Sequence, residues 1–154
     1  MRTDKNVEEF EPVLTVDYYY DGVPRHGIAN YRGVPHIYQC VFDDTTEDWT
    51  SFFDLSPIET EVLDLALEKW AIWKRWKTAF HQGLIMIDTH PALDAHPALP
   101  PDQKRSSELR EALEGRLAVD PARTVRCRAD FRRIPGEWDG LSIASFEVHW
   151  QPTE

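Results

Sequence analysis

The segment from residue 57 to residue 82 constrains the fold more strongly than any other part of the chain. Residues 56–59 read Ser-Pro-Ile-Glu, the pattern of a capping box with proline at the first helical position, and Gly83 is a stop signal. Between them, apolar side chains recur at the spacing of one helix face. The sequence therefore predicts a long amphipathic helix with a buried, tryptophan-rich stripe. The stripe contains Val62, Leu65, Ala66, Trp73, Trp76 and Phe80.

Alternation of apolar and polar residues predicts strands on both sides of this helix. Asp21-Gly22 and Arg32-Gly33 are typical of tight hairpin turns between the first three strands. The resulting order, ββββ-αα-ββ, predicts the α+β class: a mainly antiparallel sheet packed on the long Trp-rich helix. The expected strands are residues 13–20, 26–32, 36–42, 49–55, 124–133 and 143–150, and a second helix is expected near residues 102–116.

The length of 154 residues fits a single domain, which we place at residues 13–152 after a flexible N-terminal arm at residues 1–12. The arm is acidic and lacks the apolar segment of an export signal, and two cysteines do not make a disulfide framework. These features predict a cytoplasmic protein with reduced thiols. No apolar run is long enough to span a membrane.

The charge of the chain limits its partners. A formal net charge of −10 argues against nucleic acid, which requires a basic face. The charge is also uneven, because residues 1–68 contain 15 of the 27 acidic residues but only 4 of the 17 Lys and Arg residues. Such asymmetry can attract a protein partner or a second copy of the chain, and it can also simply keep the surface solvated.

A tandem repeat provides the main candidate metal site. The sequence Asp88-Thr-His90-Pro-Ala-Leu is followed directly by Asp94-Ala-His96-Pro-Ala-Leu. Carboxylates and neutral imidazoles are competent ligands for zinc or manganese, so one hypothesis is a metal-dependent enzyme, most plausibly a hydrolase, that uses this repeat or histidines gathered from the sheet. The alternative is a duplication in a tolerant surface loop, which the extended backbone before each proline favours.

The sequence contains no phosphate loop, dinucleotide fingerprint, nucleophile elbow or zinc-finger spacing, so no cofactor and no catalytic residue is predicted. We therefore expect a non-catalytic binding or interaction module, with a pocket for a small molecule between sheet and helix as a further alternative. Arginines alternating along one strand face and aromatic residues outside the core stripe are the candidate contacts. They are Tyr19, Tyr31, Trp70, Arg126, Arg128 and Arg132.

Six segments of the sequence carry a resemblance to other proteins. They are residues 19–22, 33–36, 55–58, 65–76, 79–81 and 96–100. Together they resemble small bacterial proteins of unknown function, over most of residues 13–150. The resemblance implies no activity and transfers no functional residue.

Overall fold

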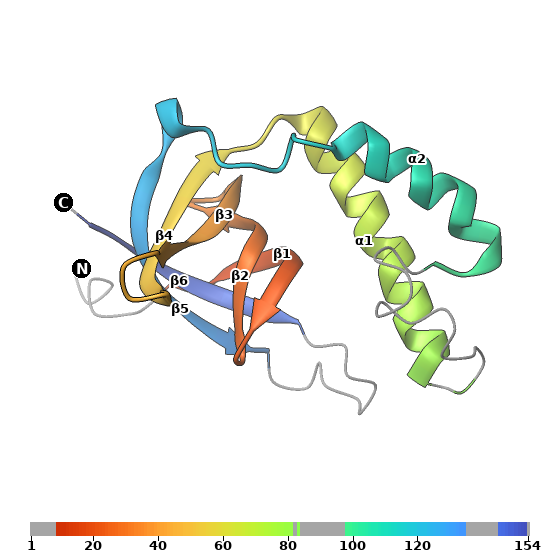
Figure 1. Cartoon of the computed structure of the whole chain (residues 1–154), viewed down its shortest axis with the longest axis horizontal. Coiled ribbons are helices and arrows are strands. Elements are labelled where there is room, and N and C mark those ends of the chain that lie inside the picture. Colours follow the sequence, from red (N-terminus) through yellow and green to blue (C-terminus); the bar gives the residue numbers. More distant parts are fainter. Residues whose placement is uncertain (1–8, 82, 84–97, 135–144, 154) are drawn as a thin grey trace, which may run out of the picture. The chain divides into compact units, whose positions relative to one another are not determined.

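The computed structural model describes residues 9–81, 83, 98–134 and 145–153, and its chain folds into two compact units (Figure 1). The barrel unit comprises residues 1–58, 118–133 and 146–154, and the helical unit comprises residues 59–117 and 134–145. Neither helix in the described part of the chain is long and apolar enough to cross a membrane. The strands are β1 (Glu11–Tyr20), β2 (Val23–Tyr31), β3 (Val34–Asp43), β4 (Asp48–Pro57), β5 (Val125–Arg133) and β6 (Phe146–Pro152); the helices are α1 (Thr60–His81) and α2 (Gln103–Leu113).

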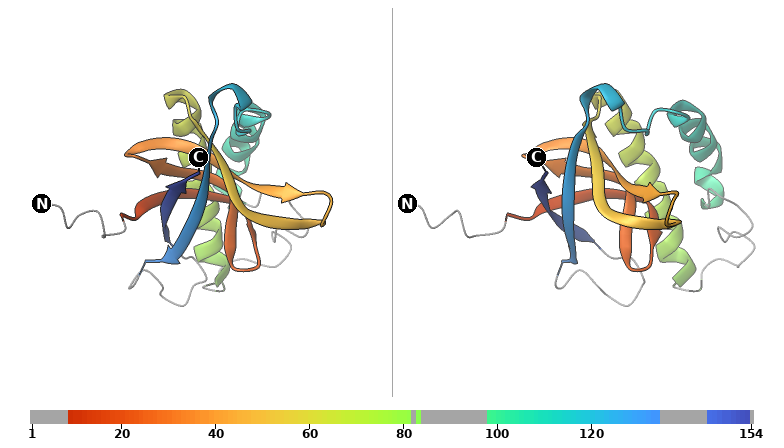
Figure 2. Two further views of the ribbon diagram at one scale, coloured as in Figure 1. Left: turned by 90° about the vertical axis from the view of Figure 1, so that its left-hand side faces the viewer. Right: turned by 60° about the vertical axis from the view of Figure 1, so that its left-hand side comes forward.

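The six strands form a closed antiparallel barrel in sequence order, and β1 pairs with β6 to close it (Figure 2). In this seam Glu11 pairs with Val148 and Pro12 with Glu147, so the end of the expected N-terminal arm belongs to β1. The predicted fold class, a sheet packed on one long helix, is therefore wrong. Register shifts in the β1–β2 and β3–β4 pairings explain the difference, because bulges bend and twist strands until the sheet edges meet. Closure leaves no edge strand.

The predicted hairpin turns are confirmed. Asp21 and Gly22 have φ of 54° and 81°, and Arg32 and Gly33 have φ of 53° and 79°. Two consecutive residues with positive φ are required in the two-residue turn whose twist matches that of the strands. Glycine at the second position adopts this conformation without strain. These turns fix the register of β1, β2 and β3.

Aromatic side chains fill the barrel interior. Tyr38, Phe53, Phe131 and Trp150 all contact one another, with ring centroids between 5.5 and 6.2 Å apart. Tilted and edge-on pairs of this kind each stabilise a core by about 0.5–1.5 kcal/mol beyond the burial of their area. The apolar faces of the strands thus pack against one another inside the barrel. Ala29, Tyr31, Cys40, Leu55, Cys127 and Val148 complete this buried cluster.

A close approach of backbone and side chain connects β1, β2 and β3. The hydroxyl of Tyr38 donates a hydrogen bond to the Thr15 carbonyl at 3.1 Å, and Thr15 Oγ1 accepts one from the Ile28 N–H at 3.1 Å. A Cβ atom on Gly27 would lie 2.7 Å from the Tyr38 hydroxyl and would also collide with the Thr15 carbonyl. Only glycine fits at this position.

In the helical unit, two bidentate ion pairs connect α1 to the segment around α2. Arg105 donates to both carboxylate oxygens of Glu68 at 2.7 Å, and Arg75 binds Asp102 in the same way at 3.0 and 3.1 Å. Leu109 of α2 packs with Ile72 of α1. Among the residues of the predicted stripe, Val62, Ala66 and Trp76 are buried, whereas Leu65, Trp73 and Phe80 are only partly so.

The predicted start of the helix is wrong. Ser56 lies in β4, where it pairs with Ile37, and its buried hydroxyl accepts a hydrogen bond from the Asp120 N–H at 3.0 Å. Helix α1 begins at Thr60 and ends at His81. Gly83, with φ of 76°, follows the helix as predicted, and its N–H donates to the Phe80 carbonyl.

Candidate functional site

Three aromatic side chains cluster at the barrel end where β1 joins β2 and β3 joins β4. Phe42 and Trp49 are paired across β3 and β4, with ring centroids 5.1 Å apart in an edge-on arrangement. The ring of Tyr18 lies 5.9 Å from Trp49. The strand pairing is irregular beside both aromatics, with extra residues in β4 opposite the segment from Cys40 to Phe42 and register shifts on either side of Tyr18. We call Tyr18, Phe42 and Trp49 the aromatic cluster.

The aromatic cluster is open to solvent. Tyr18 is 48% exposed and Phe42 is 44% exposed, while Trp49 is half-buried beside them. In the described part of the barrel, five large hydrophobic side chains are exposed, and four of them lie in the strand ends at this end of the barrel. Large apolar groups concentrated in this way on a protein surface are typical of a binding site. The four are Tyr18, Tyr19, Tyr20 and Phe42, and the fifth is Val34 next to the opposite turn.

Arg25 and Cys40 support the cluster from the barrel side. The guanidinium carbon of Arg25 lies 5.4 Å from the centre of the Trp49 ring, and its Nη1 donates to Cys40 Sγ at 3.4 Å. The Cys40 thiol in turn donates to the Thr50 carbonyl at 3.2 Å. Burial raises the pKa of Cys40 above its ordinary value, although Arg25 acts in the opposite direction. A protonated, hydrogen-bonded thiol is suited to structure and not to nucleophilic attack.

An acidic turn follows directly on the cluster. The Asp43 carboxylate accepts from the Thr45 N–H at 2.8 Å, and the Asp48 carboxylate accepts from the Trp49 N–H at 2.8 Å. These two acids therefore shape the turn between β3 and β4. Asp44 and Glu47 are exposed at its tip.

The three arginines of the predicted site project outward from β5, and each is engaged by other residues of the barrel. Arg126 forms a bidentate ion pair with Asp54 at 2.8 and 3.0 Å, and Arg128 lies over the Phe52 ring. Arg132 pairs with Glu147 and lies 3.7 Å over the Phe10 ring. The inward residues between them, including Cys127 and Phe131, pack in the core as predicted.

The three predicted aromatic contacts lie in different environments. Tyr31 is buried in the barrel core, where burial raises its pKa. Tyr19 is exposed at the same barrel end as the aromatic cluster, and its ring lies 5.9 Å from that of Phe146. Trp70 belongs to the helical unit, is half-buried, and stacks on Trp73 at 4.9 Å. Of these three residues, Tyr19 alone lies at the aromatic end of the barrel.

The predicted metal ligands Asp88, His90, Asp94 and His96 lie outside the described residues. Within the described ranges, no group of three or more His, Cys, Asp or Glu side chains is arranged to hold a metal ion. The metal-dependent enzyme therefore stays a prediction from sequence.

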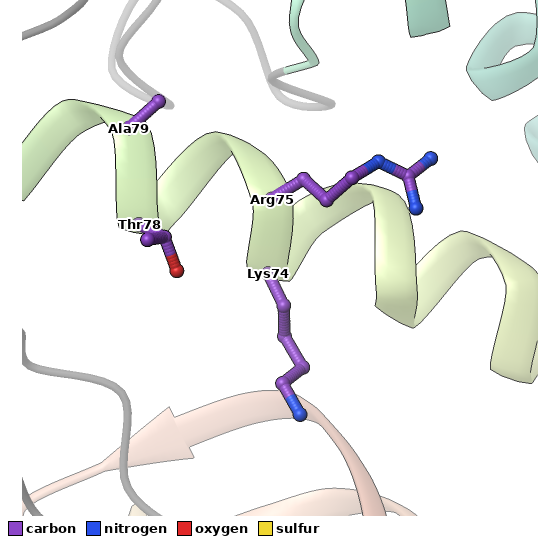
Figure 3. Close-up of a pocket in the computed structure, with 4 residues that line it drawn as sticks. All are labelled: Lys74, Arg75, Thr78 and Ala79. Carbon is purple, nitrogen blue, oxygen red and sulfur yellow. The ribbon is translucent and has the colours of Figure 1, made fainter.

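A depression of about 320 Å³ lies on α1, lined by Lys74, Arg75, Thr78 and Ala79 (Figure 3). Figure 3 shows Lys74 and Thr78 on one side of the helix and Ala79 on the other, so these side chains do not converge on a ligand. Arg75 is already occupied by Asp102. The aromatic cluster is the stronger candidate site.

Sequence reasoning missed Phe42 and Trp49, which it assigned to ordinary strands, and placed Tyr18 on a regular strand face. A usable signal was present: aromatic residues stand next to acidic turns in Tyr18–Gly22 and again in Phe42–Trp49. Charged residues are rarely buried, so aromatic residues directly beside several acids are expected at exposed strand ends.

The fold and the site define a closed six-stranded antiparallel barrel with an exposed aromatic end. Comparisons with protein families, with curated proteins and with solved structures find no match to this chain.

Proposed function

We propose that this chain is a non-catalytic interaction module that binds a protein partner through the aromatic cluster. The observation that supports the proposal is the concentration of exposed aromatic side chains at one barrel end. Exposed aromatic residues are the most common energetic anchors of protein interfaces, because they bury a large area at low entropic cost. Tyr18 and Phe42 contribute little to the barrel core, so folding alone does not account for them.

The chemistry of the barrel supports binding over catalysis. Its interior is filled by four mutually packed aromatic rings, which leaves the strand ends as the place for recognition. The two thiols, Cys40 and Cys127, are buried with raised pKa values. The β5 arginines are held by neighbouring strands, so the proposal uses the aromatic end of the barrel and not that strand face.

Site-specific photo-crosslinking tests the proposal. A photoreactive phenylalanine analogue at position 42 should form a covalent adduct with one protein in the cells that make this chain. The same analogue at position 34 is the matched control, since Val34 is at least as exposed as Phe42 but lies next to the β2–β3 turn. The same adducts from both positions, or none from position 42, would contradict the proposal.

A further inference from the structure

The two hairpins that carry the aromatic cluster are strongly acidic. Residues 17–26 and 42–49 together contain six carboxylates, but their basic side chains are limited to Arg25 and His26. Arg25 is drawn inward by Cys40 and Trp49, and His26 faces Asp17 at 4.0 Å. The two hairpins therefore carry an excess of negative charge, while Arg133 of β5 lies beside Tyr19 at the same barrel end. The six acids are Asp17, Asp21, Asp43, Asp44, Glu47 and Asp48.

Two of these acids face each other across the hairpin, although each also accepts a backbone hydrogen bond in the turn. Asp43 and Asp48 are directly paired across β3 and β4, next to the pair of Phe42 and Trp49. Like charges placed opposite each other destabilise a strand pair. A cationic group docked beside the aromatic rings would relieve this repulsion, whereas an anionic ligand would increase it.

Aromatic rings and carboxylates favour the same kind of ligand. The face of an aromatic ring attracts Lys and Arg cations, and the barrel uses this contact itself where Arg25 lies over Trp49 and Arg128 over Phe52. Lys and Arg side chains also have apolar stems that cover rings while their charged ends reach nearby carboxylates. A basic and partly apolar segment satisfies both features of this surface.

We infer that the partner of the aromatic cluster presents a basic segment, in which Lys or Arg residues flank an apolar residue. This inference rests on the proposed function and gives the chemical class of the partner. The apolar residue would cover Tyr18 and Phe42, and the cations would face the turn that carries Asp44 and Glu47. Charge of this kind accelerates association and makes binding depend on salt.

The test uses two short synthetic peptides with the same central Leu and Phe residues, flanked by Lys in one and by Glu in the other. Binding to the isotope-labelled full chain is followed through its amide chemical shifts. The Lys peptide should shift residues 17–26 and 42–49 and should bind at least tenfold more weakly when the salt concentration is raised several-fold. The Glu peptide should not bind.

Two variants with the same net charge make the test specific. Removal of the charges at the turn, in the double variant Asp44→Asn and Glu47→Gln, should weaken binding of the Lys peptide about fivefold. The control, Glu111→Gln with Glu114→Gln, removes two exposed acids from the helical unit and should change binding less than twofold. Equal weakening by both variants would mean attraction by net charge alone and would overturn the inference.

The outcomes separate this inference from the proposed function. If the crosslinked partner is lost with Phe42→Thr but retained with the Asp44 and Glu47 double variant, the aromatic cluster is the docking surface. The inference that the partner presents a basic segment is then wrong. If Phe42→Thr changes neither peptide nor partner binding, the proposed function itself fails. If ultracentrifugation shows a dimer that dissociates with the double variant, the occupant is a second copy, and the inferred separate partner is excluded.

Discussion

At the scale of single residues, the barrel depends on one position where no side chain fits. Gly27 lies under the contact between the Tyr38 hydroxyl and the Thr15 carbonyl. Its φ is not in the left-handed region, so the requirement is for space and not for backbone freedom. The contact holds β1 at its bulge, close to the strand end that presents Tyr18.

We predict that Gly27→Ala lowers the free energy of unfolding by about 2–3 kcal/mol, because the added methyl group overpacks a site with no room. Tyr38→Phe alone should cost about 1 kcal/mol through the lost hydrogen bond. The double variant should be less destabilised than the sum, since Phe removes the Tyr38 hydroxyl, one of the three atoms that the new methyl group meets. Urea unfolding measures all three, and strict additivity would contradict this packing.

The buried thiols should make the free energy of unfolding depend on pH in the alkaline range. Burial raises the pKa of Cys127 to about 11, from an ordinary value of 9.0. Between these values the unfolded chain has already released the thiol proton while the folded chain retains it, so stability falls as pH rises. We predict that the free energy of unfolding decreases less between pH 8 and pH 10.5 in Cys127→Ala than in the wild type. The same pH dependence in both would argue against the raised pKa.

At the scale of elements, the connection from β4 to α1 shows tertiary pairing overriding a local signal. Ser56 fits a capping box by sequence, but its backbone pairs with Ile37 and its hydroxyl accepts from the Asp120 N–H. The helix begins four residues later, at Thr60. A four-residue sequence pattern cannot show that a strand will pair with a partner elsewhere in the chain.

The strand pairing in the structure and the capping box expected from sequence predict different hydrogen-bond partners for Ser56. In the structure, Ser56→Ala leaves the Asp120 N–H without its acceptor and should cost about 1–2 kcal/mol. Glu59→Ala should change stability by less than about 0.5 kcal/mol, because Glu59 is exposed and its contact with Arg116 is long, at 4.0 Å. Thermal unfolding of both variants measures this. A comparable loss from Glu59→Ala would favour the capping box.

Elements defined by local pattern were predictable, and those defined by long-range pairing were not. The alternation of β5 placed Cys127 inward and Arg126 outward from sequence alone. Closure was missed because the pairing of Glu11 with Val148 joins opposite ends of the chain. The site was missed for a related reason: the register shifts beside Tyr18 and Phe42 are properties of strand pairs, and the signal that was present, aromatic residues next to acidic turns, does not show them.

At the scale of the whole molecule, charge and apolar exposure coincide. The acidic excess of residues 1–68 falls partly on the two hairpins that carry the aromatic cluster. An evenly spread charge would serve solubility alone, whereas acids gathered around exposed rings can also select a partner by charge. In the proposed function, the barrel provides a rigid support and its strand ends provide recognition.

The affinity of the crosslinked partner for two matched variants tests this account most directly. Phe42→Thr and Val34→Thr each replace an exposed apolar residue on β3 with the same β-branched polar residue, at opposite ends of the strand. Isothermal titration calorimetry should show binding at least tenfold weaker for Phe42→Thr and within twofold of the wild type for Val34→Thr. Equal affinities for the two variants would contradict a binding surface at the aromatic end of the barrel.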